Sequence, residues 1–394
     1  MHGSQPTRPV TAYPALFDGA FRPFFLAAAV WAASAIALWI TMFRGVFRLA
    51  GPFDPLAWHI HEMLFGFVFA AIAGFLLTAI PNWTGRPPIR GLRLAALLLL
   101  WIAGRLVSTI ALPIPFAAAV VIDLSFAVAL AVVAAREVML ARNWRNLLVI
   151  MPVTLLGAAN LLSWLEAGNL RPSGVAWRLG LAAILILVSV IASRIVPAFT
   201  RNWLSKRQGS MVMVAAPRLV DRLALGTLHA GLIGWVLFPE SRLVGGVLVF
   251  AGAANALRLV HWRGIATGAE PLLLILHIGY LWVALGAALL GASMLTIAVP
   301  LAAAIHALTA GAIGTMIVAV MSRVSFGHSG RPLHADAMTT AIYAVIVAAG
   351  LTRVAAAFPG GLSAALLDIS AALWSLGFLL FALRFAPILC TPRQ

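Results

Sequence analysis

Two histidines, His61 and His306, stand at the head of segments that share the same spacing of residues. Each is followed by a glycine after five residues and by a Thr/Ser-Gly-Arg triplet that begins after 23 residues: Gly66 with Thr84-Gly85-Arg86, and Gly311 with Ser329-Gly330-Arg331. The apolar stretch between histidine and triplet, about 20 residues with a rise of about 1.5 Å each, is long enough to cross a bilayer. Two imidazoles on equivalent membrane helices are suited to hold a haem iron or another metal.

Three more histidines extend this set of candidate metal ligands. His59 precedes His61 by two residues, and on a helix the two side chains point about 200° apart, so we expect them to serve two sites, or one to ligate while the other supports it. His277 is expected in the opposite half of the membrane from His306. His328 lies in a glycine-flanked turn that either brings backbone close to a ligand or only turns the chain. A single intramembrane histidine is as often structural, but several in one chain favour a function.

Three charged residues lie inside the predicted spans, and one of them is next to the histidine pair. Glu62 follows His61 directly, and Arg105 and Asp123 lie within the third and fourth apolar runs. The favoured interpretation is a structural ion pair of Arg105 with Asp123 or Glu62. The functional alternative is that Arg105 or Arg22 binds a haem propionate through its planar guanidinium group. Glu62 is the candidate catalytic residue, because a carboxyl group there could relay protons to a metal-bound ligand.

The composition is that of a polytopic membrane protein. Hydrophobic residues make up 63% of the 394 residues and charged residues only 10%, with a mean hydropathy of +1.03; a soluble core does not need so much apolar surface. The apolar runs are continuous rather than alternating with period two, which favours an all-α bundle over a β-barrel. The single cysteine, Cys390, excludes a thiolate cluster, so a metal must be held by His, carboxylate, Met or backbone. Twelve transmembrane helices are predicted, near residues 24–43, 58–80, 93–110, 115–136, 146–165, 175–197, 222–238, 243–260, 271–291, 297–322, 337–356 and 362–386.

These runs are expected to form one integral membrane domain over residues 1–394. It would comprise an N-terminal tail (1–23), a twelve-helix bundle (24–386) and a C-terminal tail (387–394). The internal repeat places its histidines on the second and tenth helices. The end of the sixth run faintly resembles the end of the second, so three four-helix units are a further interpretation, with a weak middle unit that has no equivalent histidine.

The formal net charge of +16 is explained by its distribution along the chain. Arginine and lysine residues gather after the second, fourth and sixth runs, whereas the connections after the third, seventh and ninth runs are nearly neutral. By the positive-inside rule, the basic loops and both termini are cytoplasmic. Because membrane topology accounts for the basic residues, a nucleic-acid partner is not expected.

Seven motifs of the chain closely resemble the NnrS family. They are FRPFFL at 21–26, WHIHEMLFGF at 58–67, GFLLTAIPNWTG at 74–85, PAFTRNWL at 197–204, LHIGY at 276–280, HALTAGAIG at 306–314 and GHSGR at 327–331. The resemblance extends over residues 15–385, and the five histidines singled out above fall on the family's motif positions. Where the family usually has Gly-Gly-Arg before Pro197, this chain has Ala192-Ser193-Arg194, which keeps the arginine but puts close backbone packing there in doubt.

The resemblance implies a twelve-helix protein of the bacterial inner membrane that contains haem and copper and takes part in nitric oxide (NO) metabolism or resistance. Combined with the repeat, it suggests that His61 and His306 flank a haem b between the second and tenth helices. His59 and His277, with His328, would then form or support a copper site, since imidazole suits both metals.

Three classes of function remain open at this point. The protein could convert NO at a haem-metal site as an oxidoreductase, which would need an electron donor such as quinol or cytochrome c. It could instead bind NO or handle metal without turnover. A transporter is the third class, because twelve spans with an internal repeat also suit that architecture.

Overall fold

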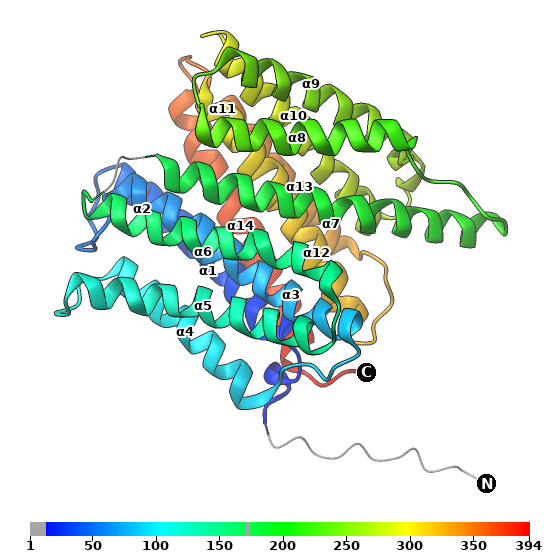
Figure 1. The fold of residues 1–394 in the computed structure, drawn as a ribbon, viewed down its shortest axis with the longest axis horizontal. Helices are drawn as coiled ribbons and strands as arrows, with labels where there is room; N and C mark the ends of the chain where they lie inside the picture. The colour runs from blue at the N-terminus through cyan, green and yellow to red at the C-terminus, as the bar shows by residue number, and fades with distance from the viewer. Residues whose placement is uncertain (1–12, 171–173) are drawn as a thin grey trace.

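The computed structural model describes residues 13–170 and 174–394, and in these residues every regular element is helical (Figure 1). The first 12 residues of the predicted N-terminal tail lie outside the described part of the chain. The long helices pack side by side in one bundle. In Figure 1, α8 (Arg218–Leu237) and α9 (Arg242–His261) lie along the upper edge, and α4 (Gly91–Thr109) and α5 (Phe116–Leu140) along the lower edge. The predicted all-α class is confirmed.

The remaining helices fill the space between these edges. They are α1 (Phe21–Phe43), α2 (Pro55–His61), α3 (Phe69–Thr84), α6 (Leu147–Ala167), α7 (Val175–Gln208), α10 (Pro271–Leu295), α11 (Leu301–His306), α12 (Gly314–His328), α13 (Ala337–Ala355) and α14 (Ser363–Cys390). Three short 3₁₀ turns lie in the connections: η1 (Ala15–Phe17), η3 (Trp144–Asn146) and η4 (Gly264–Thr267).

Eleven segments of the described residues are long and apolar enough to cross a membrane. They correspond to eleven of the twelve predicted spans, so the protein is a multi-pass membrane protein. The other predicted span forms α8, a helix of 20 residues whose first turns carry Arg218, Asp221 and Arg222. Asp221 is paired within the bundle, because Arg258 of α9 donates from Nε to its Oδ1 at 2.7 Å.

Several predicted helix ends are too early, and three of these lie at a proline. α3 is predicted to end at residue 80 but continues through Pro81 to Thr84. α7 was predicted to end at residue 197 but continues to Gln208, with Pro197 inside the helix. α14 runs through Pro387 to Cys390, so the predicted tail over 387–394 begins with helical residues. A proline interrupts only one backbone hydrogen bond of a membrane helix, and neighbouring groups can compensate for that loss.

One end of the bundle gathers segments that are distant in the sequence. Arg22, at the start of α1, donates from Nη1 to the carbonyl oxygen of Leu389, near the end of α14, at 2.8 Å. The backbone N–H of Phe21 donates to Thr78 Oγ1, near the end of α3, at 3.1 Å. The Phe21 ring also lies against His328 at the end of α12, with ring centroids 5.7 Å apart. The start of α1 therefore lies beside the ends of α3, α12 and α14.

The two repeated segments share a rare backbone conformation. Directly after the repeated histidine, each α-helix changes to a π-helix of seven residues: α2 leads into η2 (Glu62–Val68) and then α3, and α11 leads into η5 (Ala307–Ile313) and then α12. By contrast, α7, which belongs to the suggested middle unit, is α-helical from Val175 to Gln208. π-helical segments are often found at functional sites. The repeat in the sequence thus corresponds to a repeat of structure.

Candidate functional site

The start of α2 determines where the histidine pair faces. Asp54 caps the helix by accepting hydrogen bonds from the backbone N–H groups of Leu56 and Ala57 at 2.9 and 3.0 Å, and Pro55 occupies the first turn. An aspartate cap followed by a proline in the first turn is a common way for a helix to begin. Two residues of α2 then point to opposite sides of the helix. His61 enters a buried polar cluster, and His59 faces a cavity.

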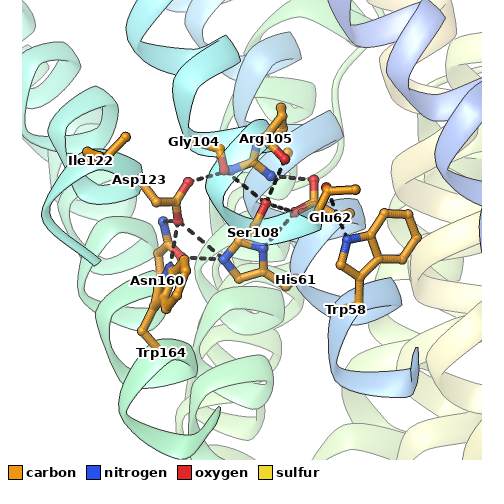
Figure 2. Close-up of polar contacts among 12 residues, drawn as sticks. Trp58, His61, Glu62, Gly104, Arg105, Ser108, Ile122, Asp123, Asn160 and Trp164 are labelled. Atoms are coloured by element: carbon orange, nitrogen blue, oxygen red, sulfur yellow. Dashed lines mark hydrogen bonds and ion pairs between the residues drawn. The ribbon is translucent and has the colours of Figure 1, made fainter. Parts of the chain in front are cut away.

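His61 is the centre of the polar cluster in Figure 2. Its Nδ1 lies 2.9 Å from Glu62 Oε1, and its Nε2 lies 2.9 Å from Asn160 Oδ1 and 3.3 Å from Asp123 Oδ2. The Asn160 amide is oriented by its own donation from Nδ2 to Asp123 Oδ2 at 2.8 Å, so its oxygen faces the imidazole. Both ring nitrogens of His61 therefore face acceptors, which requires both to carry a proton.

Arg105 of α4 completes the charge balance of this cluster. Its Nη1 donates to Glu62 Oε2 at 2.6 Å and its Nη2 donates to Asp123 Oδ1 at 2.5 Å (Figure 2). Two cations, His61 and Arg105, then offset two carboxylates, and all four side chains are at most 5% exposed. We call His61, Glu62, Arg105, Asp123 and Asn160 the ion network.

Neutral donors saturate the two carboxylates. Ser108 Oγ and Trp31 Nε1 donate to Glu62 at 2.6 and 2.9 Å. Trp164 Nε1 donates to Asp123 Oδ2 at 2.9 Å. Buried charges are tolerated where opposite charges and hydrogen bonds replace the lost water. The ion network ties η2 to α4, α5 and α6, and Trp31 adds a contact to α1, so these bonds hold the first π-helical segment in place.

Gly66, five residues after His61, leaves the space that side chains of the ion network occupy. A Cβ atom at Gly66 would lie 2.7 Å from Arg105 Nη1, 2.8 Å from Glu62 Oε2 and 2.8 Å from Trp31 Nε1. At the equivalent Gly311, a Cβ atom would lie 2.5 Å from the Trp282 ring. The glycine at this position of both repeats is therefore explained by the close approach of a neighbouring side chain.

Replacing Gly66 with alanine is expected to lower the free energy of unfolding by about 1–3 kcal/mol, the usual cost of overpacking a core. The atoms that the new methyl group meets are fixed by ionic hydrogen bonds and cannot move aside cheaply. Thermal unfolding of the purified protein in detergent measures the effect. Gly226→Ala in α8 is the matched control, because a Cβ atom there meets nothing within 4 Å; equal melting temperatures of the two variants would contradict this account.

His59 lines a large cavity on the other side of α2. The cavity has a volume of about 320 Å³ and lies between α1, α2, η2, α7, α11, η5, α13 and α14. Its walls are almost entirely apolar. Apart from tryptophan indoles, the polar side chains that reach it are His59, Thr309, His306, Ser370 and Arg353. We call this space the large cavity.

Two buried polar atoms at the large cavity have no hydrogen-bond partner among the described residues. The Nδ1 atom of His59 and the Nε1 atom of Trp39 are both buried and unpaired. The two rings stack on each other, with centroids 4.2 Å apart and planes inclined by 26°. Unpaired buried polar atoms are rare and call for an explanation such as a bound ligand.

His306 and Arg353 face the same cavity from the other repeat and from α13. His306 directs Nδ1 at the carbonyl oxygen of Ala302, 2.7 Å away, which fixes the ring and leaves Nε2 free. This arrangement is typical of metal-binding histidines. Arg353 forms no hydrogen bond or ion pair within the described part of the chain, although it borders an apolar cavity in a membrane helix. Two imidazoles and one guanidinium group thus share one space.

The structure does not bring all predicted site residues together. His61 and His306, the pair suggested to flank a haem, lie at different places, because His61 belongs to the ion network and both its ring nitrogens are engaged. Glu62 and Arg105 lie in the same network, which matches the interpretation as an ion pair. Arg22 contacts the end of α14 and does not line the large cavity.

His277 and His328 do not line the large cavity, and the two histidines have different neighbours. His277 Nε2 is hydrogen-bonded to Thr200 Oγ1 at 2.9 Å, and a Cβ atom on Gly264 would lie 2.7 Å from its Nδ1, so the ring is closely covered. His328 packs against Phe21 at the end of α12. Among the described residues, no three His, Cys, Asp or Glu side chains group as metal ligands.

Sequence reasoning missed Arg353, Asn160 and Trp164. Arg353 lies near the end of the predicted run 337–356, where a basic residue ordinarily marks the membrane boundary. The sequence did contain a signal for Arg353, because it lies inside an apolar run, as Arg105 does, and charged residues inside such runs are candidates for a function. Asn160 and Trp164 gave no such signal, since uncharged polar residues are common in membrane helices.

A comparison with family models agrees with the motifs in the sequence. The model of the family described as "NnrS protein" matches residues 15–393, which is nearly the whole chain. No curated protein matches the chain significantly.

Proposed function

Because the chain belongs to the NnrS family and is therefore a membrane protein related to nitric oxide, we propose that it binds NO at a haem held in the large cavity. The observation that carries this proposal is that the unpaired Nδ1 of His59, the His306 imidazole with its Nδ1 anchored, and the Arg353 guanidinium group line one cavity with otherwise apolar walls. Cavities of about 300–1,000 Å³ are the usual size of cofactor sites.

The residues present fit a haem. Imidazole is the common protein ligand of haem iron, and His306 offers a free Nε2 with its Nδ1 already anchored. His59 offers a second imidazole from the first repeat. Arg353 suits a propionate, because a guanidinium group binds carboxylates with two parallel hydrogen bonds. When held through only one of these two imidazoles, the haem would supply an iron atom that can coordinate NO.

The chain itself would provide three things for this chemistry. The apolar walls exclude water from the large cavity. The Ala302 carbonyl oxygen orients His306, and the ion network fixes the segment that carries His59.

We further propose that this end of the bundle faces the periplasm of a bacterial inner membrane, since the opposite end holds the start of α1 and the basic segments after α3 and α7.

We do not propose a copper site. His59, His277 and His328, which were expected to form or support a copper site, lie in three separate places. Within the large cavity, His59 and His306 are the two imidazoles of the lining, and we propose them as haem residues rather than as copper ligands.

Haem retention of an Arg353→Gln variant tests the proposal. A hydrogen bond to a charged group contributes about 1.5–3 kcal/mol, so loss of the guanidinium group should weaken haem binding about tenfold or more. The ratio of haem to protein after purification and dilution measures this. The control is Arg44→Gln, which removes an exposed ion pair with Asp368. Equal haem retention in both variants would argue against the large cavity as the site.

Reduction kinetics distinguish an enzyme from a protein that only binds NO. An oxidoreductase must receive electrons, so quinol or a c-type cytochrome should reduce its haem rapidly and sustain NO consumption. A haem that binds NO but accepts no electrons from either donor would identify a non-catalytic NO-binding protein. A purified chain that holds neither haem nor another metal would instead favour a transporter.

A further inference from the structure

A second, smaller cavity adjoins the large one. It has a volume of about 70 Å³ and lies between α1, α3, α7 and α12, on the side of the large cavity away from His59. The two cavities share two lining residues, Val68 and Ile313. These are the last residues of η2 and η5, so they occupy equivalent positions of the repeat, seven residues after His61 and His306. We call this space the small cavity and the Val68–Ile313 pair the constriction.

The chemistry of the small cavity restricts what it can hold. Its walls are formed by Phe, Val, Ile, Leu, Ala and Met side chains, among them Phe25, Ala71 and Met316. A water molecule in a buried site needs about two to four polar partners, so an apolar cavity of this kind stays dry and takes apolar guests such as xenon. The volume is too small for a haem, a quinone ring with its tail or a peptide. A small uncharged gas molecule fits both the size and the lack of polarity.

The small cavity also borders the lipid-facing surface of the bundle. Several of its lining residues are only partly buried, including Val188 and Ile191 on α7 and Ile317 on α12. These residues lie within segments that cross the membrane. An uncharged diatomic gas dissolves better in hydrocarbon than in water, so the bilayer core is a reservoir of such molecules beside this surface.

We infer that the small cavity is a docking site for NO on a lateral route from the bilayer core, past the constriction, into the large cavity. This inference rests on the proposed function, since NO is the gas that the large cavity would receive. The last residues of the π-helical segments η2 and η5 form the constriction. These rare segments would therefore have a role beyond the placement of the histidines.

The rate of NO binding tests the route. Val188→Phe extends a ring from α7 into the small cavity, and Val128→Phe makes the same change at a lipid-exposed position of α5. In lipid nanodiscs, flash photolysis of the NO adduct should give an association rate about tenfold lower for Val188→Phe, which corresponds to a barrier higher by about 1.4 kcal/mol. The equilibrium absorption spectrum with NO should be unchanged. An unaltered rate would overturn the route while leaving the proposed function intact.

Xenon binding tests the small cavity independently of any haem. Xenon-129 NMR of the purified protein should show a bound signal in the wild type and in Val128→Phe that is lost in Val188→Phe. A signal that persists in Val188→Phe would overturn the docking site. Ile317→Phe fills the same cavity from α12 and replaces Val188→Phe if that variant does not fold. Xenon binding without any haem would refute the proposed function but retain a gas-binding cavity. Absence of a bound xenon signal from the wild type would overturn the docking site.

Discussion

Replacing Arg105 with methionine is expected to destabilise the folded protein by about 3–5 kcal/mol, because breaking a buried ion pair leaves uncompensated charge in the interior. Arg105 is the only guanidinium group of the ion network, and it contacts Glu62 and Asp123 at 2.6 and 2.5 Å. Without it, two fully buried carboxylates would face one imidazolium. Unfolding of the purified variant by heat or denaturant in detergent measures the loss.

Two comparisons make this prediction specific. Arg44→Met breaks an ion pair with Asp368 whose side chains are 39% and 52% exposed, and exposed pairs contribute at most about 1 kcal/mol. Adding Glu62→Gln to Arg105→Met removes one of the two unpaired carboxylates, so the double variant should recover part of the stability. A double variant that is less stable than Arg105→Met alone would show that charge balance does not govern the network.

Replacing His306 with alanine should reduce haem affinity by more than about 100-fold. Loss of a residue that merely supports a metal-binding histidine already costs about 10- to 100-fold in metal affinity, and here the ligand itself is removed. His59→Ala should also alter the Soret band or lower haem content, since His59 faces the same cavity. Haem content and absorption spectra of the purified variants measure both effects.

The matched control for these variants is His277→Ala. His277 is equally a histidine of a membrane helix and is 4% exposed, but it lies beside Thr200 and Gly264, away from the large cavity. The His277→Ala variant should keep the haem content of the wild type. If His277→Ala loses haem while His306→Ala retains it, the cofactor must be sought beside Thr200 and Gly264 instead of in the large cavity.

Much of the fold follows from the sequence, because hydrophobic runs of sufficient length leave few alternatives in a membrane. The start of α2 also has a recognisable signal in the sequence, since Asp54 is a typical helix cap and Pro55 a typical first residue. Helix ends at Pro197 and Pro387 could not be predicted, since whether a membrane helix continues through a proline depends on the neighbours that compensate for the missing hydrogen bond.

The sequence identifies several residues of the candidate site, but it does not show which of them lie together. The spacing from His61 to Gly66 and from His306 to Gly311 correctly identified a repeat, yet equivalence in a repeat does not place two residues in one site. His59 reaches the large cavity and His61 does not, because residues two apart on a helix point in opposite directions. The sequence cannot tell which of the two directions is inward. Only the packing of α1, α4, α5 and α6 around η2 decides it.

The most direct test of the central proposal is a cryo-electron microscopy map of the protein purified from cells supplied with haem. We expect planar density in the large cavity, in contact with His306 and His59 and with a carboxylate arm directed at Arg353. A map in which the large cavity contains only lipid, while haem density lies elsewhere or beside His277, would contradict it.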